Sequence, residues 1–234
     1  MLDFPDARER MVERQIARRG VSDPAVLAAM RRVPREAFVP GRLRELAYED
    51  MPLPIEAGQT ISQPYIVAAM VAAAAVQPGD KALEIGAGSG YSAAVLAEIA
   101  GRVVAIERHE ALARAARRRL SALGYGNVEV HTGDGTLGWP DAAPFDVIIA
   151  TAGGPRVPQT WLDQLSIGGR LVMPVGESPR RQRLMKMVRK GEDAFEQEQL
   201  GEVMFVPLIG EHGWDEREDR APRRRVERRP SESP

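Results

Sequence analysis

Short apolar runs alternate with helical segments from residue 66 to residue 208. The runs expected to form strands are KALEIG (81–86), RVVAIE (102–107), VEVHTGD (128–134), FDVIIAT (145–151), GGRLVMPVG (168–176), RLMKMVRK (183–190) and GEVMFVPL (201–208). The segments expected to be helical are 66–75, 91–100, 111–124 and 157–165. This alternation predicts an α/β fold, with a mostly parallel seven-stranded sheet covered by helices on both faces. A charged turn separates the last two runs, which predicts an antiparallel pair.

The residues before this region read differently. Residues 6–19 carry a weak apolar stripe that ends at Gly20, and Ser22-Asp23-Pro24 is typical of a second helix start. PREAFVP (34–40) breaks that helix, and residues 41–57 are expected to be irregular. We therefore divide the chain into an N-terminal helical extension (1–65), which ends in the polar stretch GQTISQPY, a core (66–214) and a tail (215–234). The tail is almost wholly charged and is expected to be disordered.

Composition excludes several classes of site. Among 234 residues there is no cysteine, which rules out disulfides, thiolate metal ligands and a cysteine nucleophile. His109, His131 and His212 stand too far apart for an i, i+4 pair, so no metal site is expected. The net charge of −1 gives no field that favours nucleic acid.

Hydropathy argues against a membrane location. The longest apolar run, residues 66–76, is shorter than the ~20 residues that span a bilayer. The N-terminus is charged and lacks the apolar region of a secretory signal. We expect a cytoplasmic protein, and a monomer, because no heptad pattern or exposed apolar stripe is evident.

A glycine loop, LEIGAGSGY (83–91), lies where the first core strand meets a helix. Such a turn at the carboxyl end of a strand is where open α/β sheets bind ligands. The spacing is G-x-G-x-G rather than the G-x-G-x-x-G of dinucleotide sites, and Glu84 precedes it. A carboxylate there repels a pyrophosphate and attracts a cation. S-adenosylmethionine, which has an ammonium and a sulfonium and no phosphate, fits this pattern.

Two more carboxylates end neighbouring strands. Glu107 closes RVVAIE, where it can accept hydrogen bonds from both hydroxyls of a ribose. Asp134, in TGDG, is placed to accept from an adenine amino group. From these patterns, the residues expected to bind the cofactor are Glu84, Gly86, Gly88, Ser89, Gly90, Glu107, Asp134 and Gly135.

The sequence resembles the protein-L-isoaspartate O-methyltransferase family of Rossmann-like class I methyltransferases. The resemblance is carried by AYEDMPLPIEAGQTISQPY (47–65), ALEIGAGSGY (82–91), GDG (133–135) and PQTWLDQLSIGGRLVMPVG (158–176), and it spans roughly residues 8–210. It implies that GQTISQPY is part of an active site in which Ser62 matches the family's active-site serine. The resemblance further implies that Thr60, Ile61 and Ser62 lie beside the cofactor and bind it. It also implies methyl transfer from S-adenosylmethionine to the free carboxylate of L-isoaspartyl residues in damaged proteins, which begins their repair.

Alternatives stay open on the residues themselves. Ser62-Gln63-Pro64 is equally typical of a helix cap. ATAGGP (150–155) has no carboxylate, amide or aromatic side chain, which suits a carboxylate substrate better than an amine. A methyltransferase for aspartate carboxylates of a dedicated peptide, and a catalytically silent module that binds S-adenosylmethionine or RNA, are the competing hypotheses.

Overall fold

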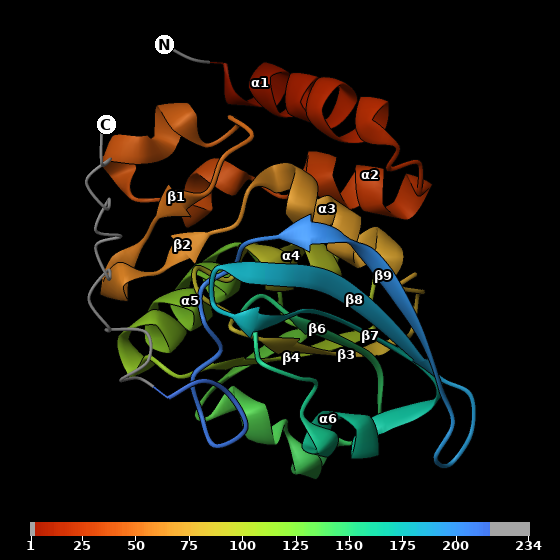
Figure 1. Ribbon diagram of the computed structural model, residues 1–234. Coiled ribbons are helices and arrows are strands. Elements are labelled where there is room, and N and C mark those ends of the chain that lie inside the picture. The colour runs from red at the N-terminus through yellow and green to blue at the C-terminus, as the bar shows by residue number, and fades with distance from the viewer. Residues whose placement is uncertain (1–2, 216–234) are drawn as a thin grey trace, which may run out of the picture.

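A seven-stranded sheet forms the centre of the molecule in the computed structural model, which describes residues 3–215 (Figure 1). The strand order is β5-β4-β3-β6-β7-β8-β9. The strands are β3 (Lys81–Ile85), β4 (Arg102–Glu107), β5 (Val128–Thr132), β6 (Phe145–Ala150), β7 (Leu165–Ser178), β8 (Arg181–Arg189) and β9 (Phe195–Val203). The pairs from β5 to β7 are parallel, and β8 pairs antiparallel with both β7 and β9. The predicted α/β class and the antiparallel last pair are confirmed.

Helices cover both faces of this sheet. One face packs against α3 (Pro64–Ala73), α4 (Tyr91–Ala97) and α5 (Glu110–Ala122), and the other packs against α6 (Gln159–Asp163). Side chains alternate between the faces along each strand. In β3, Ala82 therefore belongs to the first cluster and Leu83 to the second. Glu84 follows Leu83, so it points toward the helices of the first face.

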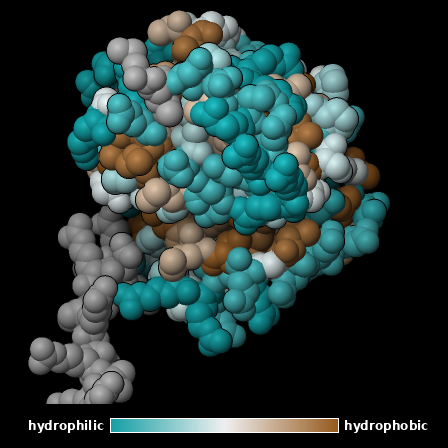
Figure 2. All heavy atoms as spheres, turned by 90° about the horizontal axis from the view of Figure 1, so that it is seen from above, coloured by the Kyte–Doolittle hydropathy of each residue, from teal (hydrophilic) through white to brown (hydrophobic). Residues whose placement is uncertain are grey.

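An N-terminal layer lies outside α3 and α4. The helix α1 (Phe4–Met11) continues through a π-helical turn (Val12–Ile16) and a 3-10 turn (Ala17–Arg19) to Gly20. The Asp23 carboxylate caps α2 (Pro24–Arg32), as its sequence predicts. The outer face of this layer is largely hydrophilic (Figure 2).

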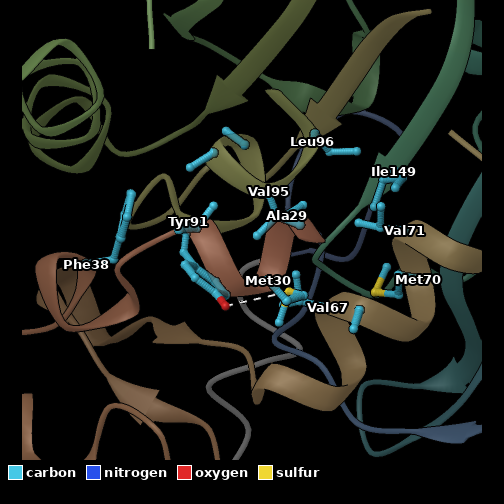
Figure 3. Close-up of a cluster of buried hydrophobic side chains, with 14 of the residues drawn as sticks. Ala29, Met30, Phe38, Val67, Met70, Val71, Tyr91, Val95, Leu96 and Ile149 are labelled. Atoms are coloured by element: carbon cyan, nitrogen blue, oxygen red, sulfur yellow. Dashed lines mark hydrogen bonds between the residues drawn. The ribbon is translucent and has the colours of Figure 1, made fainter. Parts of the chain in front are cut away.

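The buried face of this layer joins the main core. Met30 of α2 contacts Tyr91 of α4, whose hydroxyl donates to the Met30 sulfur at 3.7 Å (Figure 3). Val67 and Met70 of α3 lie beside them, and Ile149 of β6 belongs to the same cluster. The apolar core is thus continuous across residue 65, and the division of the chain there stays a prediction.

The segment between the N-terminal layer and α3 is more ordered than expected. It contains 3-10 turns at Arg35–Phe38, Gly41–Leu46 and Glu56–Gly58. Two short antiparallel strands, β1 (Leu53–Pro54) and β2 (Thr60–Ile61), pair Leu53 with Ile61 and Pro54 with Thr60. The prediction that residues 41–57 are irregular is wrong at Gly41–Leu46, at Leu53–Pro54 and from residue 56 onward.

The last strand is displaced from its predicted position. Residues 201–208 were expected to pair, whereas β9 runs over Phe195–Val203 and residues 204–208 leave the sheet. Of the predicted tail, 215–234, only Asp215 lies within the described residues. No helix among residues 3–215 is both long enough and apolar enough to span a membrane.

Candidate active site

A cavity of about 310 Å³ opens at the carboxyl ends of the central strands. Ile85, Glu107 and Thr151 from the ends of β3, β4 and β6 line it together with the 58–60 and 206–209 segments. This is the edge of an open α/β sheet where ligands bind. Of the residues predicted from sequence, it brings together Thr60, Gly86, Gly88, Glu107 and Gly135.

A smaller cavity of about 30 Å³ adjoins the first. The two share Thr60, Gly86, Gly88 and Thr151 in their walls. The predicted residues that line only the smaller one are Ile61, Ser62, Glu84 and Ser89. Gly90 lines neither cavity; it is the N-cap of α4 and lies against Leu120. Residues from the stretch GQTISQPY (58–65) and from the glycine loop therefore line the same cavities, as the sequence predicts.

The glycine loop is fixed between two strands. Gly86 has a φ of +90°, and a Cβ there would lie 2.8 Å from the Thr151 Oγ1, so only glycine fits. The Gly86 and Ala87 amides both donate to the Ile106 carbonyl, at 2.8 and 3.0 Å. The Thr151 hydroxyl donates to the Gly86 carbonyl at 2.7 Å. These bonds hold the loop open over the cavity.

Glu107 connects the glycine loop to the start of α5. Its Oε2 accepts from the Gly88 amide at 2.8 Å, and its Oε1 accepts from the His109 amide at 2.9 Å. Each carboxylate oxygen has two lone pairs, so both retain capacity for another donor. The side chain is almost fully buried but lines the large cavity, which fits a role in binding hydroxyl groups.

The Glu84 carboxyl group is fully buried and has no hydrogen-bond partner among residues 3–215. Burial, and to a lesser extent the charge of Glu107, raises its pKa to about 8. The Ser92 side chain opposes this shift in the pKa, although it does not reach either oxygen with normal hydrogen-bond geometry. An unpaired buried carboxylate at a cavity wall is a site that a cationic group would satisfy.

Asp134 makes contacts that its sequence position did not reveal. It lines neither cavity, and its Oδ1 accepts from the Thr136 amide and hydroxyl at 2.8 and 2.7 Å. Its Oδ2 accepts from the Glu211 amide at 2.8 Å. Partial burial raises the pKa of Asp134, but these hydrogen bonds outweigh that effect and the net pKa lies below the usual range. Its predicted contact with adenine stays a prediction.

Residues 209–214 form a strap, which we call the C-terminal strap, beside the large cavity. The Glu211 bond to Asp134 and a 3.2 Å bond from the His212 amide to the Thr136 hydroxyl hold its centre. The Trp214 indole donates to the Gly153 carbonyl at 3.0 Å. Ile209, at its start, lines the cavity.

Ser62 does not cap the following helix. The N-cap of α3 is Gln63, which makes no side-chain cap bond, and the Tyr65 amide instead donates to Asp50 Oδ1 at 3.3 Å. The capping alternative for Ser62 is therefore wrong. The half-buried Ser62 hydroxyl makes no hydrogen bond to residues 3–215 and lies in the wall of the small cavity with Glu84.

Several lining residues were missed from the sequence. His109, Thr151 and Leu208 all contribute to the large cavity. Thr151 follows β6 directly, so its position at a strand end was an available signal. His109 offered none, because its place depends on the turn that Glu107 fixes.

Comparisons with known proteins agree with this geometry. A sequence model described as protein-L-isoaspartate(D-aspartate) O-methyltransferase matches residues 6–213. A protein-L-isoaspartate O-methyltransferase of Rhodopseudomonas palustris (strain ATCC BAA-98 / CGA009) is 62% identical over 208 residues, which cover 89% of this chain and 95% of that protein. One from Pelobacter propionicus is 60% identical, with 88% and 92% covered.

Solved structures give the same result. A protein-L-isoaspartate O-methyltransferase structure superposes with a TM-score of 0.79 at 32% identity, covering 88% of this chain and 67% of that one. A Plasmodium falciparum crystal structure in complex with S-adenosyl-L-homocysteine has a TM-score of 0.75 at 24% identity, covering 86% and 98%. The second similarity supports the fold alone.

Proposed function

We propose, from the premise that this chain belongs to the protein-L-isoaspartate(D-aspartate) O-methyltransferase family, that Ser62 orients the substrate carboxylate in its active site. The enzyme transfers a methyl group from S-adenosylmethionine to the free carboxylate of isoaspartyl residues, which starts the repair of damaged proteins. What the family relationship leaves open is how the residues of this chain divide the work.

The residues at the two cavities fit the cofactor. S-adenosylmethionine, when bound, supplies a methyl group on a positively charged sulfur. The uncompensated Glu84 carboxylate is suited to a cationic group, and Glu107 has free lone pairs for ribose hydroxyls. Gly86 and Gly88 leave the loop without side chains on the cavity side. We propose that Glu84 holds the positive end and Glu107 the ribose.

One observation carries the role of Ser62. Ser62 lines the small cavity with Glu84, and its hydroxyl makes no hydrogen bond to residues 3–215. A hydroxyl in that position is free to donate to an anionic substrate. The β1–β2 ladder and the Asp50–Tyr65 bond hold the chain on either side of it.

The chemistry needs orientation more than proton transfer. A carboxylate with a pKa near ~4 is already ionised at neutral pH, so it attacks without a general base. Holding the nucleophile in line and excluding water supplies most of what catalysis requires, on the order of several kcal/mol. A neutral donor such as Ser62 aligns the carboxylate without removing its charge.

Substitution of Ser62 by alanine tests this role. We expect kcat toward an isoaspartyl peptide to fall about 10- to 100-fold, because one orienting hydrogen bond is lost. The dissociation constant for S-adenosylmethionine and the melting temperature should change little. Ser121→Ala, an exposed serine near the end of α5, is the matched control. Full activity in Ser62→Ala would refute the orienting role.

The substrate is tested with matched isoaspartyl and aspartyl peptides and a labelled cofactor. Base-labile methyl groups should appear on the isoaspartyl peptide alone. Methyl groups on both peptides, or on the aspartyl peptide, would favour an enzyme for aspartate carboxylates.

We also propose that the enzyme works as a cytoplasmic monomer without a nucleic-acid partner. The net charge of −1 supports the absence of a nucleic-acid partner. Light scattering after size exclusion, with and without RNA at low salt, measures the mass of the particle. A mass near twice 25.6 kDa, or one that rises with RNA, would contradict this.

A further inference from the structure

Residues 50–54 contact the chain on both sides of Ser62. On the N-terminal side, Leu53 and Pro54 pair with Ile61 and Thr60 in the β1–β2 ladder. On the C-terminal side, Asp50 accepts the hydrogen bond from the Tyr65 amide. One short segment therefore fixes where Ser62 enters and leaves its loop.

Asp50 replaces the cap that α3 lacks. No side chain from residues 62–64 satisfies the first amides of this helix, and Asp50 satisfies the Tyr65 amide from outside. A carboxylate there is also favoured by the positive end of the helix dipole. The cap matters for Ser62 because the helix begins at Pro64, only two residues later.

Arg19 holds Asp50 and Tyr65 together. Its Nη1 donates to Asp50 Oδ2 at 2.5 Å, and its guanidinium lies 3.4 Å from the centre of the Tyr65 ring. The two contacts use different parts of one planar cation. Asp50 thus accepts from Tyr65 with one oxygen and from Arg19 with the other.

The N-terminal layer and the Arg35–Phe38 turn that follows it fix the residues just before Asp50. The Arg35 Nε donates to the Ala47 carbonyl at 2.7 Å, and the Gln15 amide donates to the Tyr48 carbonyl at 2.9 Å. The Tyr48 hydroxyl accepts from Arg8 at 2.8 Å and donates to Glu36. The N-terminal layer therefore provides a rigid base for Asp50.

We infer that Asp50, with Arg19, is a positioning pair for the active-site serine. This pair acts through Tyr65 and the start of α3, and neither Asp50 nor Arg19 lines a cavity. The inference rests on the proposed role of Ser62 and adds the residues that set its position. It also gives the N-terminal layer a part in catalysis.

The experiment compares Asp50→Ala, Asp50→Asn and Arg19→Ala in the full chain. For Asp50→Ala we expect kcat toward an isoaspartyl peptide to fall about 10- to 100-fold, because small displacements of an orienting group cost that much. The dissociation constant for S-adenosylmethionine should stay within about 3-fold, because Glu84 and Glu107, the proposed main cofactor contacts, lie outside the segment that Asp50 fixes. Asparagine keeps an acceptor for the Tyr65 amide, so Asp50→Asn should recover part of the lost kcat and resemble Arg19→Ala. The double variant Asp50→Asn/Arg19→Ala should be no worse than Arg19→Ala alone, because Arg19→Ala already removes the ion pair that Asp50→Asn removes.

The matched control is Arg31→Ala, which removes another exposed arginine–carboxylate pair of the N-terminal layer, that with Glu9. It should retain full kcat. Hydrogen exchange of residues 62–67 adds a measurement that does not depend on activity, and it should be faster in Asp50→Ala. Unchanged kcat, or equal losses of kcat and cofactor affinity, would overturn the inference. If the unmodified protein methylates neither peptide, the proposed function fails. The exchange measurement still tests the Asp50–Arg19 positioning pair: faster exchange in Asp50→Ala supports it, and unchanged exchange overturns it.

Discussion

At the scale of single residues, Glu84 is an acidic group that the site leaves uncompensated. Its carboxyl group is fully buried and accepts no hydrogen bond from residues 3–215, beside a glycine loop that supplies no cation. Replacement by glutamine should weaken S-adenosylmethionine binding at least ~10-fold, because a charged contact is lost. Calorimetric titration measures this. Unchanged affinity would show that the positive end of the cofactor binds elsewhere.

The same substitution should stabilise the free protein. Burial raises the pKa of Glu84 from 4.5 to about 8. Between these values the folded protein holds a proton that the unfolded chain has released, so the contribution of Glu84 to stability is full below pH 4.5 and falls as the pH rises toward 8. Without cofactor, Glu84→Gln should therefore melt above the parent by on the order of 10 °C at pH 8 and by little near pH 5. A difference in melting temperature that does not change with pH would contradict this.

Most of the residues predicted to bind the cofactor line a cavity, because strand ends can be read from the sequence and the family resemblance pointed to residues 60–62. Nine of the eleven predicted residues line one cavity or the other, and the exceptions, Gly90 and Asp134, serve the packing of α4 and of the C-terminal strap. The alternative of Ser62 as a cap was wrong for a related reason. The competing cap, Asp50, is remote from the helix in sequence, and only the fold brings it there.

At the scale of elements, the C-terminal strap depends on a close approach. A Cβ on Gly210 would lie 2.1 Å from the Asp134 Oδ1, so alanine there must separate the strap from Asp134. We expect Gly210→Ala to weaken cofactor binding about 5- to 10-fold, since the strap hydrogen bonds are lost and Ile209 shifts at the cavity wall. Titration measures the affinity.

Gly133→Ala is the control for this change. Gly133 adjoins Asp134, and a Cβ there meets nothing within 4 Å. It should bind cofactor as tightly as the parent. Equal affinity in both variants would mean that the strap does not contribute to cofactor binding.

The strand assignments failed where burial does not dictate the pattern. Most of the residues of β9 are exposed, and its first half, FEQEQL, is polar because the strand lies at the edge of the sheet. The apolar Val206 and Leu208 suggested a strand there, but they pack against the second core cluster and line the cavity. The two-residue strands β1 and β2 are too short to leave a periodic signal. The central strands β3, β4 and β6 were predicted well because most of their positions are apolar and buried.

At the scale of the whole molecule, Arg35 joins the N-terminal layer to the core. It is fully buried, its guanidinium carbon lies 4.8 Å from the Tyr91 ring centre, and neither terminal nitrogen has a hydrogen-bond partner among residues 3–215. Arg35→Ala should lower the free energy of unfolding by roughly 2–4 kcal/mol, since it opens a cavity and strands the Ala47 carbonyl. Arg35→Met, which fills the volume without a buried charge, should cost less than about half of that. Denaturant unfolding compares them, and equal losses would contradict this account.

The continuous core has a consequence for how the chain is made. The apolar faces of α1 and α2 pack against α3 and α4, and α4 ends at Ala97. During synthesis, the first two helices leave the ribosome some 65 residues before α4 is complete, which is roughly 3–13 s at 5–20 residues per second. Met11, Ile16 and Met30 stay uncovered for that time. The nascent chain is therefore most exposed to aggregation and to chaperones before its cofactor-binding half exists.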